Sequence, residues 1–215
     1  MDWDHARYLM VEQQIRTWNV TDMQVLQRFL DVKREDFVPA DKKELALADI
    51  ELPLGDGVFM LAPKIEAKFL QESAIKPTDR VLVIGATTGY LVALAAGLAS
   101  QVYGVEARGE LVEFANAALK NAGIKNAQVV QGDAGAALAG QAPFDLILVC
   151  ASAPALPQAY IDQLAEQGRL IMVVGEQPVM TARLVTRSAG GAVQERGLFE
   201  YNLPAFAAQR AIFAF

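Results

Sequence analysis

The sequence contains one cysteine and one histidine among its 215 residues. A single cysteine, Cys150, cannot form a disulfide within the chain, which is typical of a protein from a reducing compartment. Cys150 ends a run of apolar residues, and a cysteine in such a place is more often a small core residue than a nucleophile. His5 lies near the amino terminus, and nothing around it indicates a role. The sequence therefore offers few groups that could act as a general base near neutral pH.

Excess positive charge and long apolar runs are lacking as well. The chain has 19 Lys and Arg against 25 Asp and Glu, a formal net charge of −6, so no basic field attracts nucleic acid phosphates. The apolar stretch at 91–100 is far shorter than a membrane span, and Gly97 interrupts it. The first residues include acids instead of the cationic start of a secretory signal. We expect a cytoplasmic protein with no nucleic acid or membrane partner and no bound metal.

The chain is long enough to bury one sizeable core. Its 215 residues, of which 53% are hydrophobic, are typical of one domain. Residues 1–79 show helical periodicity, with a helix start indicated at Asn19–Asp22, and are expected to form a helical amino-terminal part. The proline and glycines of residues 52–57 predict a loop within that part. We expect residues 80–215 to form an α/β core within the same domain, residues 1–215.

From residue 80 onward, short apolar runs alternate with helical patterns. The run Arg80–Ile84 is apolar at nearly every position, as in a strand that is buried on both faces. The other expected strands are 101–105, 127–131, 144–150 and 169–174, with two edge strands at 182–187 and 210–215. The expected helices are 90–99, 110–122 and 156–165. This alternation predicts a doubly wound, mostly parallel Rossmann-like sheet, which binds ligands beyond the carboxyl ends of its strands.

Two features at that edge of the sheet indicate a nucleoside ligand. Gly85 and Gly89 lie in a turn between a strand and a helix, where backbone N–H groups are available to a ligand. Glu106 ends the next strand, about 20 positions after Gly85, which is the spacing at which an acid meets ribose hydroxyls. Taken separately, the glycines could form an ordinary turn and Glu106 could be a surface acid. Their occurrence in one βαβ unit favours the nucleoside.

The same region lacks the glycine pattern of a dinucleotide site. No G-x-G-x-x-G is present, so a ligand without a pyrophosphate, S-adenosylmethionine, is expected. An NAD-dependent oxidoreductase is the less favoured alternative. Asp133, which ends the third strand after Gly132, could accept a hydrogen bond from an adenine amino group. It could equally cap a helix that begins at Ala134.

An ordered set of motifs resembles the protein-L-isoaspartate O-methyltransferase family. The resemblance spans roughly residues 8–200, and no single motif in it is decisive. The motifs are Val11–Arg16, Arg34–Pro39, Leu52–Gly57, Val81–Tyr90, Val102–Glu106, Gly132–Gly135, Phe144–Pro157 and Gly168–Gly175.

The resemblance implies a class I methyltransferase fold that transfers a methyl group from S-adenosylmethionine to a carboxylate, with S-adenosylhomocysteine as product. In the family this carboxylate belongs to isoaspartyl residues of damaged proteins. Such a carboxylate is already anionic at neutral pH, so the reaction needs no general base. The cofactor-binding residues expected here are Gly85, Ala86, Thr87, Gly89, Tyr90, Glu106, Asp133 and Ala134. The expected substrate-loop positions are Phe59, Leu61 and Pro63.

The substrate loop departs from the family pattern. The family sequence Thr-Ile-Ser-Gln-Pro is replaced here by residues 59–63, so both hydroxyls and the amide are missing. Val83 replaces the acid before the glycine turn, and Thr87 replaces its middle glycine. Three interpretations remain open: isoaspartyl methylation through backbone groups, methylation of a more apolar carboxylate or hydroxyl substrate, and a non-catalytic sensor or scaffold that keeps the cofactor site. The apolar residues 59–61 could also simply pack in the core.

Overall fold

The amino-terminal part is built from short helices. In the computed structural model, which describes residues 2–206, α1 (Trp3–Leu9) continues into a π-helical turn, Met10–Ile15, and a 3-10 turn, Arg16–Trp18. Helix α2 (Met23–Asp31) begins at the expected place, because the Asp22 side chain accepts hydrogen bonds from the backbone N–H groups of Gln24 and Val25. Two further 3-10 turns follow at Arg34–Asp36 and Ala40–Leu45. Helix α3 (Pro63–Ser73) then leads to the sheet.

The segment at 52–60 forms a β-hairpin, where the sequence predicted a loop at 52–57. Strand β1 (Leu52–Gly55) pairs antiparallel with β2 (Val58–Met60). Asp56 and Gly57 form the turn with φ values of 49° and 75°, the conformation that suits a tight hairpin. The sequence therefore identified the turn residues correctly, but a strand of three or four residues is too short to show an alternating pattern.

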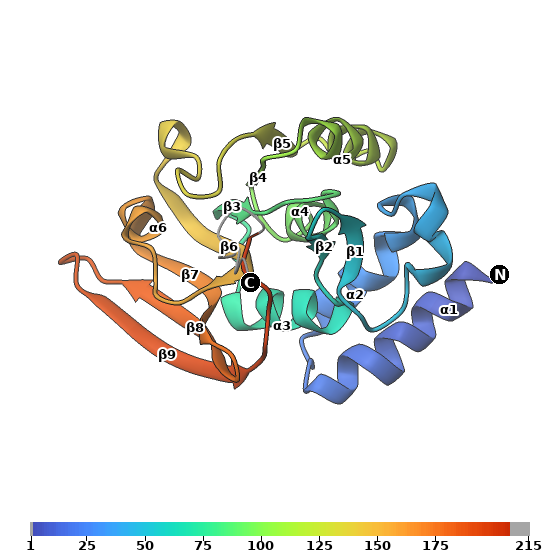
Figure 1. Ribbon diagram of the computed structural model, residues 1–215, viewed down its shortest axis with the longest axis horizontal. Helices are drawn as coiled ribbons and strands as arrows, with labels where there is room; N and C mark the ends of the chain where they lie inside the picture. The colour runs from blue at the N-terminus through green and yellow to red at the C-terminus, as the bar shows by residue number, and fades with distance from the viewer. Residues whose placement is uncertain (1, 207–215) are drawn as a thin grey trace, which may run out of the picture.

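A seven-stranded sheet forms the centre of the molecule, in the order β5-β4-β3-β6-β7-β8-β9 (Figure 1). Strands β5, β4, β3, β6 and β7 are parallel to one another. Strand β8 is antiparallel to β7, and β9 is antiparallel to β8. This arrangement confirms the predicted α/β fold with its mostly parallel sheet. The bounds are β3 Arg80–Ile84, β4 Gln101–Glu106, β5 Ala127–Gln131, β6 Phe144–Ala153, β7 Leu164–Glu176, β8 Val179–Arg187 and β9 Val193–Glu200.

Helices cover both faces of the sheet. Val81 and Val83 of β3 face a core that includes α3, α4 (Tyr90–Ala96) and α5 (Gly109–Asn121). Leu82 and Ile84 face a second core, which includes α6 (Gln158–Asp162) and residues near a 3-10 turn at Ala139–Gln141. All four side chains are fully buried, and burial of such a side chain stabilises a fold by about 1.5–3 kcal/mol. Alternate residues of β3 thus hold the two helical layers together.

Some predicted boundaries differ from the structure. The helix expected at 156–165 is only α6, because Leu164 already pairs with Phe144 in the sheet. Strand β6 runs three residues beyond Cys150, where Ser152 is bridged to Ala205. Strand β9 was missed because it is an exposed edge with little apolar alternation. The strand expected at 210–215 lies outside the described residues.

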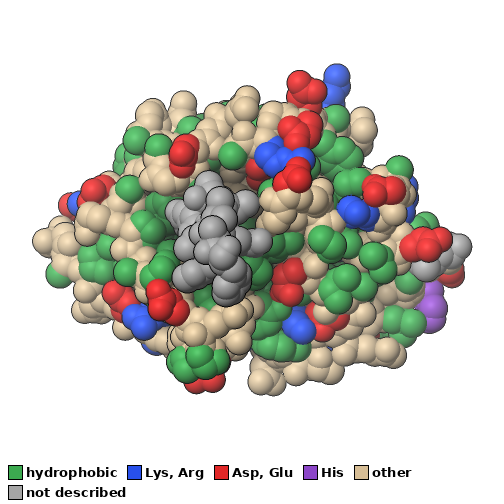
Figure 2. Space-filling model, viewed as in Figure 1, with side chains coloured by type: hydrophobic (Ala, Val, Ile, Leu, Met, Phe, Trp, Pro, Cys, Tyr) green, Lys and Arg blue, Asp and Glu red, His purple; other side chains and the backbone are tan. Residues whose placement is uncertain are grey.

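The surface mixes charges of both signs. On the face shown in Figure 2, the visible Lys and Arg side chains lie next to Asp and Glu side chains. Among residues 2–206, no helix is both long enough and apolar enough to cross a membrane.

Candidate active site

A cavity of about 670 Å³ opens at the carboxyl ends of the parallel strands. This size suits a drug-sized ligand or cofactor. Its floor comes from the ends of β3, β4 and β5, through Gly85, Glu106 and Gly132, and from Cys150 of β6. One wall is the hairpin of β1 and β2, from residues 56–59, and the chain after β9 also contributes to the lining. The site therefore combines the sheet with segments that are distant in the sequence.

The turn after β3 is held against the neighbouring strand. The backbone N–H groups of Gly85 and Ala86 both donate to the carbonyl of Val105, at 2.9 and 3.0 Å. Gly85 has a φ of 79°, and Thr87 has a φ of 47°, which is unusual for a β-branched residue. Left-handed backbone at a residue with a Cβ costs roughly 1–2 kcal/mol. The turn therefore keeps its shape although Thr87 has replaced a glycine.

Glu106 is buried, with only 6% of its surface exposed, so it is not the surface acid that the sequence left open. One carboxylate oxygen accepts from the N–H of Thr87 and the other from the N–H of Arg108, both at 3.0 Å. Glu106 also lines the cavity. Because a carboxylate oxygen can accept more than one hydrogen bond, both oxygens can still receive hydroxyl donors.

Asp133 lines the cavity beside Glu106, but its side chain is exposed. Its Oδ1 accepts from the N–H of Gly135 at 2.6 Å. Residues 134–138 form turns and no helix, so Asp133 caps a turn, and the helix considered from the sequence is absent. This contact leaves the other carboxylate oxygen of Asp133 available to a ligand, so capping and ligand binding are compatible roles.

The strand order arranges these residues in a line. Asp133, Glu106 and Gly85 lie at or just beyond the ends of β5, β4 and β3, and Cys150 lies in β6, three residues before its end; these four strands are neighbours in the sheet. Adjacent strands are about 4.8 Å apart. The cavity floor thus suits an extended ligand that crosses the strands.

Comparisons with known proteins match this geometry. The family model of protein-L-isoaspartate(D-aspartate) O-methyltransferases matches residues 6–201. A protein-L-isoaspartate O-methyltransferase from Koribacter versatilis is 40% identical over 91% of this chain and 86% of its own length. One from Rhodopseudomonas palustris is 42% identical over 79% of this chain and 69% of its own. The chain belongs to the protein-L-isoaspartate O-methyltransferase family. It is thereby an S-adenosylmethionine-dependent methyltransferase, which confirms the family, enzyme class and cofactor predicted from the sequence.

Solved structures show the same fold. A protein-L-isoaspartate O-methyltransferase from Plasmodium falciparum, in complex with S-adenosyl-L-homocysteine, aligns with a TM-score of 0.77 at 24% identity, over 93% of this chain and 96% of its own. A second protein-L-isoaspartate O-methyltransferase aligns with a TM-score of 0.80 at 24% identity, over 93% of this chain and 65% of its own.

The structure brings only some of the expected site residues of this family member to the cavity. Those that line it are Phe59, Gly85, Thr87, Glu106, Asp133 and Ala134. Those that do not are Leu61, Pro63, Ala86, Gly89 and Tyr90. Gly89 and Tyr90 begin helix α4, and Pro63 begins α3. A role for any of them as a ligand contact stays a prediction.

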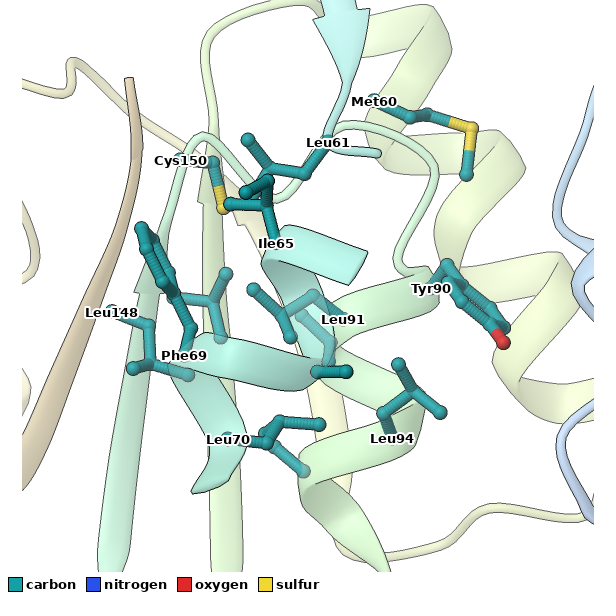
Figure 3. Close-up of a cluster of buried hydrophobic side chains, with 14 of the residues drawn as sticks. Met60, Leu61, Ile65, Phe69, Leu70, Tyr90, Leu91, Leu94, Leu148 and Cys150 are labelled. Atoms are coloured by element: carbon teal, nitrogen blue, oxygen red, sulfur yellow. The ribbon is translucent and has the colours of Figure 1, made fainter. Parts of the chain in front are cut away.

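Leu61 and Tyr90 belong to the buried core behind the cavity. Figure 3 shows Leu61 next to Ile65 and Cys150, and Tyr90 on the other side of the same cluster. Leu61 is 2% exposed and Tyr90 is 1% exposed. The core-packing alternative for residues 59–61 therefore applies fully to Met60 and Leu61, whereas Phe59 packs against the same core and also lines the cavity.

A buried ion pair is connected to residues 59–63, the predicted substrate loop. The Arg34 guanidinium contacts Glu66 and donates to the carbonyl of Leu61 at 2.7 Å, and it lies 4.6 Å from the centre of the Tyr90 ring. Burial raises the pKa of Glu66 to about 7, although the charge of Arg34 opposes that rise. Arg34 belongs to a motif that the family resemblance identified, but its partners were not predictable from the sequence.

Several lining residues were missed by sequence reasoning, among them Cys150, Arg108 and Phe206. Burial, together with the charges of Glu66 and Glu106, raises the pKa of the Cys150 thiol, so this side chain stays neutral and is a poor nucleophile. Arg108 donates to the carbonyl of Gly55 at 3.3 Å and so connects the hairpin to the sheet. Phe206 follows β9, a strand that lacked a sequence signal. Of these three residues, only Cys150 had a sequence signal, as the last residue of an expected strand.

Proposed function

We propose that this protein transfers the methyl group of S-adenosylmethionine to a carboxylate in a damaged protein, the isoaspartyl carboxyl being the class that its relatives' names indicate. The observation that carries the proposal is Glu106, a buried carboxylate at the end of β4 that lines the cavity with both oxygens fixed by backbone N–H groups. Asp133 on one side and the Gly85 turn on the other extend the same site. A nucleoside with vicinal hydroxyls fits this set of acceptors.

In this proposal the residues of this chain position the cofactor and the substrate, and they take no part in acid–base chemistry. The cofactor provides a methyl group on a positively charged sulfur, and a carboxylate is ionised at neutral pH, so no residue must remove a proton. Glu106 and the Gly85 turn would hold the cofactor. The hairpin would place the substrate carboxylate and keep water out, and such alignment is a large part of catalysis.

The whole chain would act as one domain in this proposal. Residues 56–59 of the helical amino-terminal part line the same cavity as Gly85 and Glu106. Arg34, also from that part, hydrogen bonds to the carbonyl of Leu61. The α/β core would bind the cofactor, and the amino-terminal part would hold the substrate.

We expect turnover of isoaspartyl peptides to be weak. Phe59 brings a ring to the cavity where the family pattern has a hydroxyl, and Leu61 is buried in the core. A carboxylate that approaches apolar side chains without paired donors pays a desolvation cost, and each missing charge-assisted hydrogen bond removes about 1.5–3 kcal/mol.

Cofactor binding is the first test. Isothermal titration with S-adenosylmethionine and S-adenosylhomocysteine should give binding by the natural protein, and Glu106→Ala should weaken it by about 1–3 kcal/mol. Glu110→Ala is the matched control, because Glu110 is an exposed acid that also contacts Arg108 but does not line the cavity. Binding of NAD instead, or equal affinity in both variants, would contradict the proposed site.

Methyl transfer is the second test. Labelled S-adenosylmethionine would be offered with an isoaspartyl peptide and, as control, with the aspartyl peptide of the same sequence. The variant Phe59→Thr, at the position of this loop that lines the cavity, should methylate the isoaspartyl peptide faster than the natural protein. Rapid turnover by the natural protein would refute the expectation about the loop. Cofactor binding without turnover in either form would favour the sensor interpretation. Val83 and Thr87, which depart from the family pattern at the glycine turn, would then be the residues to test for the loss of turnover.

A further inference from the structure

The chain after β9 returns to the sheet and is fixed to β6. Ser152 donates from its backbone N–H to the carbonyl of Pro204 at 3.1 Å, and from its hydroxyl to the carbonyl of Leu203 at 2.6 Å. Ser152 also forms a parallel bridge with Ala205, and Leu203 is fully buried. Residues 203–205 are therefore anchored by backbone pairing, and the next residue, Phe206, lines the cavity.

The Phe206 ring packs directly on the Gly85 turn. A Cβ placed on Gly85 would lie 2.6 Å from Cε1 and 3.1 Å from Cζ of this ring. At that distance an added Cβ would overlap the ring, so the ring lies in the space beside the glycine. Cys150 lies on the same side, since its Cβ is 3.5 Å from the same point. An aromatic ring thus covers the end of β3, next to Cys150 of β6.

The order of the strands would place this ring next to the reacting part of a bound cofactor. Under the proposed function, on which this inference rests, the ribose is held by Glu106 at the end of β4 and the adenine lies toward Asp133 at β5. The sulfur is bonded to the other side of the ribose, so it would lie toward β3, where Phe206 rests on Gly85. One strand spacing is about 4.8 Å, which is within the range of about 6 Å over which a ring attracts a cation.

We propose that Phe206 is a positioning residue that recognises the positive charge on the cofactor sulfur by a cation–π contact. The natural reaction removes this charge. The carboxylate oxygen forms a bond to the methyl carbon while the bond between that carbon and the sulfur breaks, and the sulfur keeps the electron pair of the broken bond. S-adenosylhomocysteine is therefore neutral at sulfur. Phe206 then favours the methyl donor over the product and helps the product to leave.

The test compares binding of the two ligands by isothermal titration, with no turnover needed. Phe206→Leu keeps an apolar side chain but removes the ring, and should weaken S-adenosylmethionine binding about three- to tenfold, the usual range for such a contact. Binding of S-adenosylhomocysteine should change less than twofold. Phe206→Tyr should restore the natural ratio. Phe199→Leu, at a partly buried ring outside the cavity, is the matched control and should leave both affinities unchanged.

Three results would overturn the inference. Equal weakening of both ligands by Phe206→Leu would mean that the ring only packs against the site. Tighter binding of both would mean that the ring obstructs the cofactor. Failure of Phe206→Tyr to restore the ratio would mean that the aromatic face is not recognised. Failure of the natural protein to bind either ligand is a different outcome, since it would refute the proposed function itself.

Discussion

Removal of Arg34 tests how the substrate loop is supported. The Arg34 and Glu66 side chains are 1% and 3% exposed and form an ion pair, and Arg34 also donates to the carbonyl of Leu61 at 2.7 Å. Arg34→Met keeps most of the volume but leaves Glu66 and the Leu61 carbonyl without this donor. We expect a large loss in the free energy of unfolding, because both groups are buried.

The size of the loss follows from these contacts. A buried ion pair that loses one partner costs about 3–5 kcal/mol, and a buried carbonyl that loses its donor costs about 1–3 kcal/mol. Glu66 limits the first cost because it can take up a proton near neutral pH, its pKa being raised to about 7 by burial. We therefore expect the lower end, about 4 kcal/mol. For a chain of this length, that lowers Tm by roughly 8–16 °C.

Urea unfolding of a double-mutant cycle measures this effect. The cycle consists of Arg34→Met, Glu66→Leu and the double variant. We expect the double variant to lose at least about 2 kcal/mol less free energy of unfolding than the sum of the two single losses, since neither charge is then buried without its partner. Arg183→Met is the control, because its ion pair with Glu195 is about 40% exposed and should contribute less than about 1 kcal/mol. An Arg34→Met loss no larger than the control, or additive single losses, would refute this account.

Three further perturbations have defined outcomes. Thr87→Gly should raise Tm by a few degrees, because it removes roughly 1–2 kcal/mol of backbone strain at φ 47°. The greater conformational entropy that glycine loses on folding offsets part of this gain. A lower Tm would contradict this. The free energy of unfolding should fall as pH rises from about 4.5 to about 7, because Glu66 holds its proton more tightly in the folded chain, and Glu66→Gln should abolish that fall relative to the natural protein. Arg108→Ala should speed cofactor dissociation a few-fold in stopped-flow measurements with less than about 1 kcal/mol change in stability, since it releases the hairpin at Gly55; an unchanged rate would show that Arg108 does not hold the cavity closed.

The sequence by itself determined the sheet and the placement of Gly85 and Glu106 at its carboxyl edge, because both depend on local pattern. Strand β3 is a continuous apolar run, which only a doubly covered strand can bury. Gly85 and Glu106 lie in one βαβ unit, whose geometry fixes where each strand ends. Strand β9 lacked such a pattern, since its residues are mostly exposed at the edge of the sheet.

The tertiary structure alone decided the hairpin side of the cavity, because its residues meet through long-range packing. Nothing local distinguishes Phe59, which lines the cavity, from Leu61, which lies in the core. Arg34 reaches Glu66 across 32 residues, and Phe206 reaches Gly85 only through the pairing of the last described segment with β6. Each of these contacts joins elements whose relative positions depend on the whole fold, so periodicity and spacing along the chain carry no record of them.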